Sequence, residues 1–174
     1  MKLKKKIMTF LENKKGVATI EIAICTMLFI IAIGAFIDLS AILSKINSIS
    51  STNAYVSRVV GAQGGVKTRT PENFKGEYIH SKELYQNVKN SLERSGLKES
   101  DWSMYIDGRR LTNSINVPLK DYGNEITIKL ETNLKWDLLS NFIPGDLTNN
   151  QTSERTVVSS FKVRTGNVKS EYKQ

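Results

Sequence analysis

The residue of this chain best placed for specific chemistry is Glu21, a carboxylate inside a long apolar segment. An ionisable side chain is unfavourable in lipid unless it has a partner. If the chain were cut after Gly16, Val17 would carry a free α-amine and Glu21 would become the fifth residue. The amine of a neighbouring chain could then pair with this carboxylate in a low-dielectric setting and fix the axial register between packed helices. The alternative is a protonated or hydrated glutamate that lies one turn inside the interface.

A second acidic residue, Asp38, follows the apolar segment. Along a helix it would lie about 25 Å beyond Glu21, so the two carboxylates are expected near opposite faces of a bilayer. They would also point about 100° apart around the helix axis, which excludes a single acid–base pair. Asp38 is therefore expected either at the outer membrane–water boundary or in a contact with another subunit.

Other side chains that commonly do chemistry are scarce in this sequence. One cysteine, Cys25, and one histidine, His80, exclude an intrachain disulfide, a cysteine-rich zinc site and an iron–sulfur cluster. No nucleophile motif accompanies His80. The segment 61–68 lacks the glycine that a phosphate-binding loop needs before its lysine, because Val66 stands there. We therefore expect no enzyme, no cofactor, no metal site and no small-molecule substrate.

Glu21 and Asp38 are positioned by a segment that is long and apolar enough to cross a membrane. Residues 22–37 contain no charged side chain, and a helix over 17–37 would be roughly 31 Å long, close to the hydrocarbon thickness of a bilayer. The first 16 residues hold six lysines and one glutamate, so they carry five of the eight net positive charges of the 174-residue chain. This bias places the N-terminus in the cytoplasm and the chain after about residue 40 outside. Because the basic balance is mostly N-terminal, we expect no nucleic-acid partner.

The segment 14–21, KKGVATIE, resembles the processing site of type IV prepilins and pseudopilins. The wider stretch 14–65 is similar to TadE-like minor pseudopilins of tight-adherence (Flp-type) pilus systems, in which an acidic residue follows the apolar run as Asp38 does here. The resemblance implies cleavage after Gly16 by a prepilin peptidase, and assembly through Glu21 and Asp38 with other pilin subunits and the pilus assembly machinery. It also implies a bacterial cell membrane, a single pass and an extracytoplasmic C-terminal domain.

Other interpretations of the N-terminal segment differ in the fate of the leader. A secretory signal peptide is disfavoured because apolar residues continue through Ile37. A lipoprotein signal is disfavoured because Ile24, which is not a small residue, precedes Cys25. The remaining alternative is an uncut, single-pass anchored adaptor whose outer domain binds another envelope component. In that case Glu21 would be dispensable.

The apolar segment is expected to continue as a helix with one apolar stripe. Spacings of three, four and seven predict a helix over 17–60 that ends before the glycine-rich residues 61–65. The stripe needs a partner, either the C-terminal domain of the same chain or other subunits. Its members are Ile42, Ile46, Ile49, Val56 and Val60.

The rest of the sequence predicts a small antiparallel sheet with one helix. Ser81 is expected to cap a helix that ends near Ser95, and Asp107-Gly108 a hairpin turn. The predicted strands are Trp102–Ile106, Arg110–Val117, Glu125–Trp136 and Arg155–Arg164, with a long turn over 139–153. The predicted fold is therefore α+β, with a basic leader (1–16), a transmembrane and spine helix (17–60), a loop (61–80) and an extracytoplasmic domain (81–174).

Overall fold

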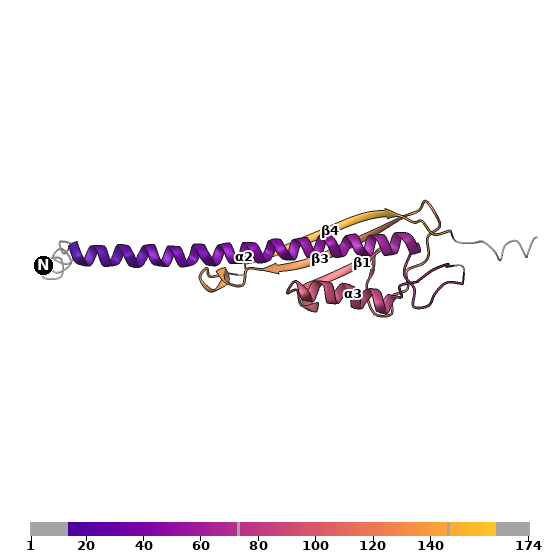
Figure 1. Ribbon diagram of the computed structural model, residues 1–174, viewed down its shortest axis with the longest axis horizontal. Coiled ribbons are helices and arrows are strands. Elements are labelled where there is room, and N and C mark those ends of the chain that lie inside the picture. Colours follow the sequence, from indigo (N-terminus) through magenta and orange to yellow (C-terminus); the bar gives the residue numbers. More distant parts are fainter. Residues whose placement is uncertain (1–13, 73, 146, 163–174) are drawn as a thin grey trace, which may run out of the picture. The chain divides into compact units, whose positions relative to one another are not determined.

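The fold is described from a computed structural model, which covers residues 14–72, 74–145 and 147–162 (Figure 1). Helix α2 begins the described chain and is followed by α3 and an antiparallel sheet. This α+β arrangement confirms the predicted fold class. The elements are α2 (Lys14–Gln63), α3 (Ser81–Arg94), η1 (Glu99–Asp101), β1 (Trp102–Ile106), β2 (Arg109–Arg110), β3 (Glu125–Lys135), η2 (Leu139–Asn141) and β4 (Thr148–Val158).

The chain divides into two compact units. The first joins the residues up to Ala41 with Trp136–Leu147, and the second joins Ile42–Lys135 with the residues from Thr148 onward. The boundary therefore falls inside α2, and the segment between β3 and β4 belongs with the apolar part of that helix. The predicted leader lies outside the described residues as far as residue 13, and so does the part of the predicted last strand beyond residue 162.

The first unit contains the apolar part of α2, whose side chains are largely exposed. Ile22, Phe29 and Phe36 expose 67%, 66% and 71% of their surface. Within the described part of the chain, α2 is the one helix long and apolar enough to cross a membrane. A helix in water would bury apolar side chains of this size on at least one face. The first unit is thus compatible with a single membrane span.

The second unit covers the predicted apolar stripe of α2. Ile42, Ile49, Val56 and Val60 expose only 7%, 3%, 0% and 0%, and Ile46 is half-buried. Burying one such side chain stabilises a fold by about 1.5–3 kcal/mol. The helical stripe is therefore confirmed, and the chain's own domain supplies the partner that the sequence left open.

Polar contacts fix how this part of α2 packs on α3 and on the sheet. The Thr52 and Ser91 hydroxyls lie 2.7 Å apart and join α2 to α3. The Asn53 amide donates to the carbonyl oxygen of Ser153 in β4 at 2.8 Å and to its hydroxyl at 2.9 Å. Both α2 residues are nearly inaccessible to water. Buried polar groups of this kind favour one packing arrangement because a shifted helix would leave them unpaired.

The sheet has the strand order β2-β1-β3-β4, with every pair antiparallel. The predicted alternation of β3 is confirmed, since Ile126, Ile128, Leu130 and Leu134 are buried and point to one face. The predicted turn between β1 and β2 is also confirmed: Asp107 and the glycine after it have φ angles of 51° and 77°, the positive values that a tight hairpin turn needs.

Two strand predictions were wrong. The last strand begins at Thr148, because residues 148–153 pair with β3 although they are polar and contain the Asn149-Asn150 turn signal. The strand predicted at Arg110–Val117 is reduced to the short β2. After Leu111 the chain turns away, and Val117 pairs instead with Val66.

The helix ends also differ from the prediction. Helix α2 is described from Lys14 onward, includes Gly16 and continues to Gln63, so the loop predicted at 61–80 starts later. Gly64 has a φ of 71°, and a Cβ placed there would lie 2.7 Å from the carbonyl oxygen of Lys120. Only glycine fits this close approach. His80, not Ser81, is the N-cap residue of α3, and the Ser81 hydroxyl donates instead to the carbonyl of Asn113.

Candidate functional site

The residues of the predicted processing site lie in the first turns of α2. Gly16 and Val17 are half-buried, and Glu21 is exposed. Val17 and Glu21 are four residues apart in a continuous helix, so they share one face. Glu21 makes no hydrogen bond or ion pair with any residue that the structure describes. Its carboxylate is therefore available to a group from outside the chain.

The side chains around Glu21 are mostly apolar and exposed. Ile20, Ile22, Ile24 and Met27 expose between 46% and 67% of their surface. Cys25 is exposed in the same segment. A carboxylate within such a surface is poorly solvated once lipid or other helices cover it, which strengthens its attraction to any cation within reach.

Asp38 has partners that the sequence did not predict. Only 4% of its surface is exposed. One carboxylate oxygen accepts backbone hydrogen bonds from Leu138 and Leu139 at 3.0 and 2.7 Å, and the other lies 3.1 Å from the Leu138 nitrogen. We call residues 138–143, which include η2, the η2 loop. Asp38 thus holds the first turn of the η2 loop against α2, because a carboxylate is a strong acceptor for unpaired amides at the start of a helical turn.

The sequence offered no signal for this pairing because the partners are 100 residues apart along the chain. The sequence predicts a long turn over 139–153 and places Asp38 at the membrane–water boundary or in a subunit contact. Neither of those roles requires backbone partners within the same chain. The burial of Asp38 leaves little carboxylate surface for a neighbouring subunit, whereas Glu21 is open.

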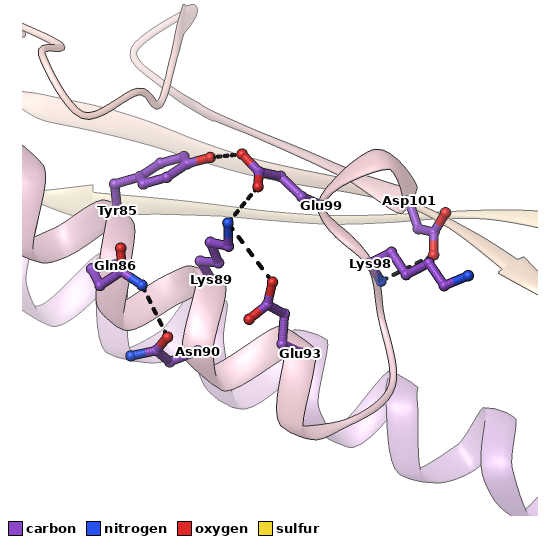
Figure 2. Close-up of polar contacts among 8 residues, drawn as sticks. All are labelled: Tyr85, Gln86, Lys89, Asn90, Glu93, Lys98, Glu99 and Asp101. Carbon is purple, nitrogen blue, oxygen red and sulfur yellow. Dashed lines mark hydrogen bonds and ion pairs between the residues drawn. The ribbon is translucent and has the colours of Figure 1, made fainter.

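A network of charged and polar side chains lies between α3 and η1 (Figure 2). The Tyr85 hydroxyl and the Lys89 amine both donate to the Glu99 carboxylate, and Lys89 also pairs with Glu93 at 3.8 Å. Lys89 and then Tyr85 lower the pKa of Glu99, while Glu99 raises the pKa of Lys89 and of Tyr85. A general acid or base needs a pKa moved toward neutrality. The pKa of the acid Glu99 is lowered and those of Lys89 and Tyr85 are raised, so all three move away from neutrality. The network therefore keeps Glu99 and Lys89 charged and links η1 to α3.

An open groove of about 660 Å³ lies in the second unit between α2 and β4. Arg58 and Arg155 lie on its lining, and the small residues Ala54 and Gly61 leave the space. No acid, histidine or cysteine lines it. The groove offers two cations to a partner, and the hydroxyls of Ser57, Thr156 and Ser160 in its lining have no acid or histidine beside them there to act as a general base.

The single histidine lies away from this groove. The His80 Nε2 lies 3.0 Å from the Thr70 hydroxyl, and its ring packs edge-on against Tyr78. Within residues 14–72, 74–145 and 147–162, no three His, Cys, Asp or Glu side chains are grouped so that they could hold a metal ion. His80 is therefore placed by local packing in the loop before α3.

No protein-family model, curated protein or solved structure matches this chain. Two features stand out: an open carboxylate, Glu21, on an apolar helix, and a buried carboxylate, Asp38, that holds a loop at the end of the apolar part.

Proposed function

We propose that this chain is a pseudopilin-like structural subunit of a cell-surface pilus or a related secretion machine, similar to TadE-like minor pseudopilins, and that its leader is cut after Gly16. The observation that carries the proposal is the position of Glu21, exposed and without a described partner in the apolar part of α2. Cleavage would give Val17 a positively charged α-amine. That amine would be the counter-charge for Glu21 of a neighbouring subunit.

The physical argument rests on what the pair does in a low-dielectric bundle. A lone carboxylate there is unfavourable by a few kcal/mol, whereas an amine within hydrogen-bonding reach offsets the desolvation. Because the pair forms at one axial offset, it selects one register between neighbouring helices, as buried polar residues do in coiled coils. Assembly would thus depend on proteolysis, since the uncut chain has no amine at Val17.

The difference in burial between the two parts of α2 supports this role. The part of α2 in the second unit is covered by the chain's own sheet and α3, as the burial of Val56 and Val60 shows. The part in the first unit keeps its apolar side chains exposed, as Phe29 does. A subunit that packs through a helix must leave one such surface uncovered until assembly.

The proposal includes a location and a set of partners. The lysine-rich leader would stay in the cytoplasm, α2 would cross the bacterial cell membrane once, and the sheet domain would be extracytoplasmic. A prepilin peptidase would remove the leader. Other pilin subunits and the pilus assembly machinery would be the partners, and the chain itself would do no catalysis.

Two measurements in the native host test this proposal. The intact mass of the mature protein should correspond to a chain that begins at Val17, and a chain that retains residues 1–16 in cells with an active prepilin peptidase would refute the cleavage. Glu21→Val should be processed normally but fail to assemble. Thr26→Val is the matched control, because it also replaces a polar side chain in the apolar segment, and its hydroxyl bonds only to its own helix. Normal assembly of Glu21→Val would refute the pairing.

A second candidate function is favoured by the groove between α2 and β4. An uncut, single-pass anchored adaptor would use Arg58 and Arg155 there to bind an acidic segment of another envelope component. In that case Glu21→Val would leave the function of the protein unchanged. Arg58→Ala with Arg155→Ala would abolish function without changing the amount of protein in the membrane.

A further inference from the structure

The η2 loop is attached to α2 at the outer end of the apolar part. Asp38 accepts the backbone hydrogen bonds from its first two residues. A Cβ placed on Gly34 would lie 3.9 Å from the Cβ of Leu138. Gly34 is about one helical turn closer to the middle of the apolar segment than Asp38. The η2 loop therefore lies alongside the last turn of that segment.

The backbone amides of the η2 loop all have acceptors within the first unit. Asp38 accepts those of Leu138 and Leu139, and the amides of residues 140–143 donate to the carbonyls of Trp136, Leu138 and Leu139. Backbone outside a regular helix is tolerated at membrane depth only where its polar groups are satisfied by protein. The η2 loop meets this condition for its donors without a water molecule.

The polar side chains of the η2 loop also turn back to its own backbone. The Ser140 hydroxyl and the Asn141 amide each donate to the carbonyl of Asp137 at 3.1 Å. Pro144, which follows the loop, has no amide to satisfy. These two side chains therefore add no unpaired donor to the surface of the loop.

The outer surface of the η2 loop is apolar. Leu138, Phe142 and Ile143 expose 38%, 50% and 44% of their surface. Residues 138–145 carry no charge, and an aspartate flanks them on each side. Trp136, a residue type enriched at membrane–water interfaces, stands at the base of the loop. On α2 itself, Phe36 is exposed at the same level, on the side of the helix away from Gly34 and Asp38, which face the loop.

We propose that the η2 loop is immersed in the outer bilayer interface, where lipid acyl chains cover Leu138, Phe142 and Ile143. The loop is then a second membrane contact beside the span, held in place by Asp38. This inference rests on the proposed membrane span of α2. Lipid fits better than a protein partner, because the loop presents apolar side chains and neither an unpaired amide nor a charge, so the hydrogen bonds and ion pairs of a specific protein interface would have to rest on its carbonyls alone.

The test uses the full chain in phosphatidylcholine vesicles, with Cys25→Ser as background. Single cysteines at Phe142→Cys, Met27→Cys and Tyr122→Cys carry a polarity-sensitive fluorophore, and lipids with a nitroxide either below the headgroup or deep in the acyl chains act as quenchers. Met27 is exposed within the apolar part of α2 and Tyr122 is exposed in the second unit. We expect blue-shifted emission at 142 that the shallow nitroxide quenches most, quenching at 27 by the deep nitroxide, and neither effect at 122.

Each outcome decides a different claim. Quenching at 27 without quenching at 142 refutes lipid contact of the loop and leaves the span intact. A blue shift at 142 without lipid quenching means that a second copy or another protein covers the loop, and this also overturns the proposal. No quenching at 27 refutes the span itself and with it the loop insertion. Ile143→Cys repeats the measurement if Phe142→Cys does not fold.

The role of Asp38 is tested in the same vesicles. Asp38→Ala should reduce the quenching at 142 while the quenching at 27 stays unchanged, because only the loop loses its acceptor. Ser40→Ala is the matched control, since its hydroxyl bonds within α2 to the carbonyl of Phe36. Unchanged quenching at 142 in Asp38→Ala would show that Asp38 does not hold the loop.

Discussion

Replacing Asp38 by alanine isolates the contribution of its carboxylate to the seating of the η2 loop. The substitution removes the acceptor of two backbone amides, those of Leu138 and Leu139. A hydrogen bond to a charged group contributes about 1.5–3 kcal/mol, so the loss of both is expected to lower the local stability of the loop by about 3 kcal/mol or more. Each 1.4 kcal/mol is about tenfold in an equilibrium constant, so loop opening should rise roughly a hundredfold.

Hydrogen exchange on the full chain in phosphatidylcholine nanodiscs measures this opening directly. In Asp38→Ala the amides of Leu138 and Leu139 should exchange much faster, while amides of the buried strand β3 keep their protection. In Asp38→Asn the exchange rates of these amides should lie between those of the wild type and Asp38→Ala, because the asparagine amide oxygen is a neutral acceptor. Ser40→Ala should match the wild type. If Leu138 and Leu139 exchange at the wild-type rate in Asp38→Ala, the carboxylate does not stabilise the loop and the reasoning is refuted.

Three further predictions concern the second unit and are checked by chemical denaturation of the full chain in detergent. Leu130→Ala should lower the free energy of unfolding by about 2–5 kcal/mol because its side chain is fully buried in β3, whereas Val158→Ala, at an exposed position, should change it little; equal effects would contradict the assigned core. Gly123→Ala should lower the free energy of unfolding by roughly 1–2 kcal/mol, the cost of a left-handed backbone alone, because no atom lies within 4 Å of its added Cβ. Gly64→Ala should lower it by more, because its added Cβ also meets the carbonyl oxygen of Lys120. Equal losses in the two variants would rule out the close approach at Gly64. Because the fold lowers the pKa of Glu99, its stabilising contribution is present above the unfolded pKa of about 4.3 and is lost as the pH falls through the lower folded value. Wild type and Glu99→Gln should therefore differ most near neutral pH and converge in acid, and a constant difference would contradict the network.

Elements with strong periodic patterns could be predicted from the sequence. The apolar stripe from Ile42 to Val60 follows the helical period, and Ile126, Ile128 and Leu130 alternate as a half-buried strand requires. Asp107-Gly108 marks a turn because those positions must adopt positive φ. In each case the local residue types and the tertiary structure favour the same conformation, which is why local reasoning was sufficient.

The missed features depend on partners that are distant in sequence. Residues 148–153 are polar and carry a turn signal, yet they form a strand because the long, well-formed β3 offers them a complete row of hydrogen-bonding groups. Asp38 finds its amides 100 residues away, in a segment that was interpreted as a plain turn. Glu21 and Gly16 remain predictions of a different kind, since their proposed partner and protease come from outside the chain.

Strand β4 ends the sheet with a row of threonine, asparagine, glutamine and serine, followed by Glu154 and Arg155. Charged side chains on an edge strand make it a poor template for another chain's backbone. A strand that paired with the free edge of β4 would have to accommodate the charges of Glu154 and Arg155, which disfavours edge-to-edge association of the sheets. Under the proposed function, association between subunits would then depend on the exposed apolar part of α2 and not on the open edge of the sheet.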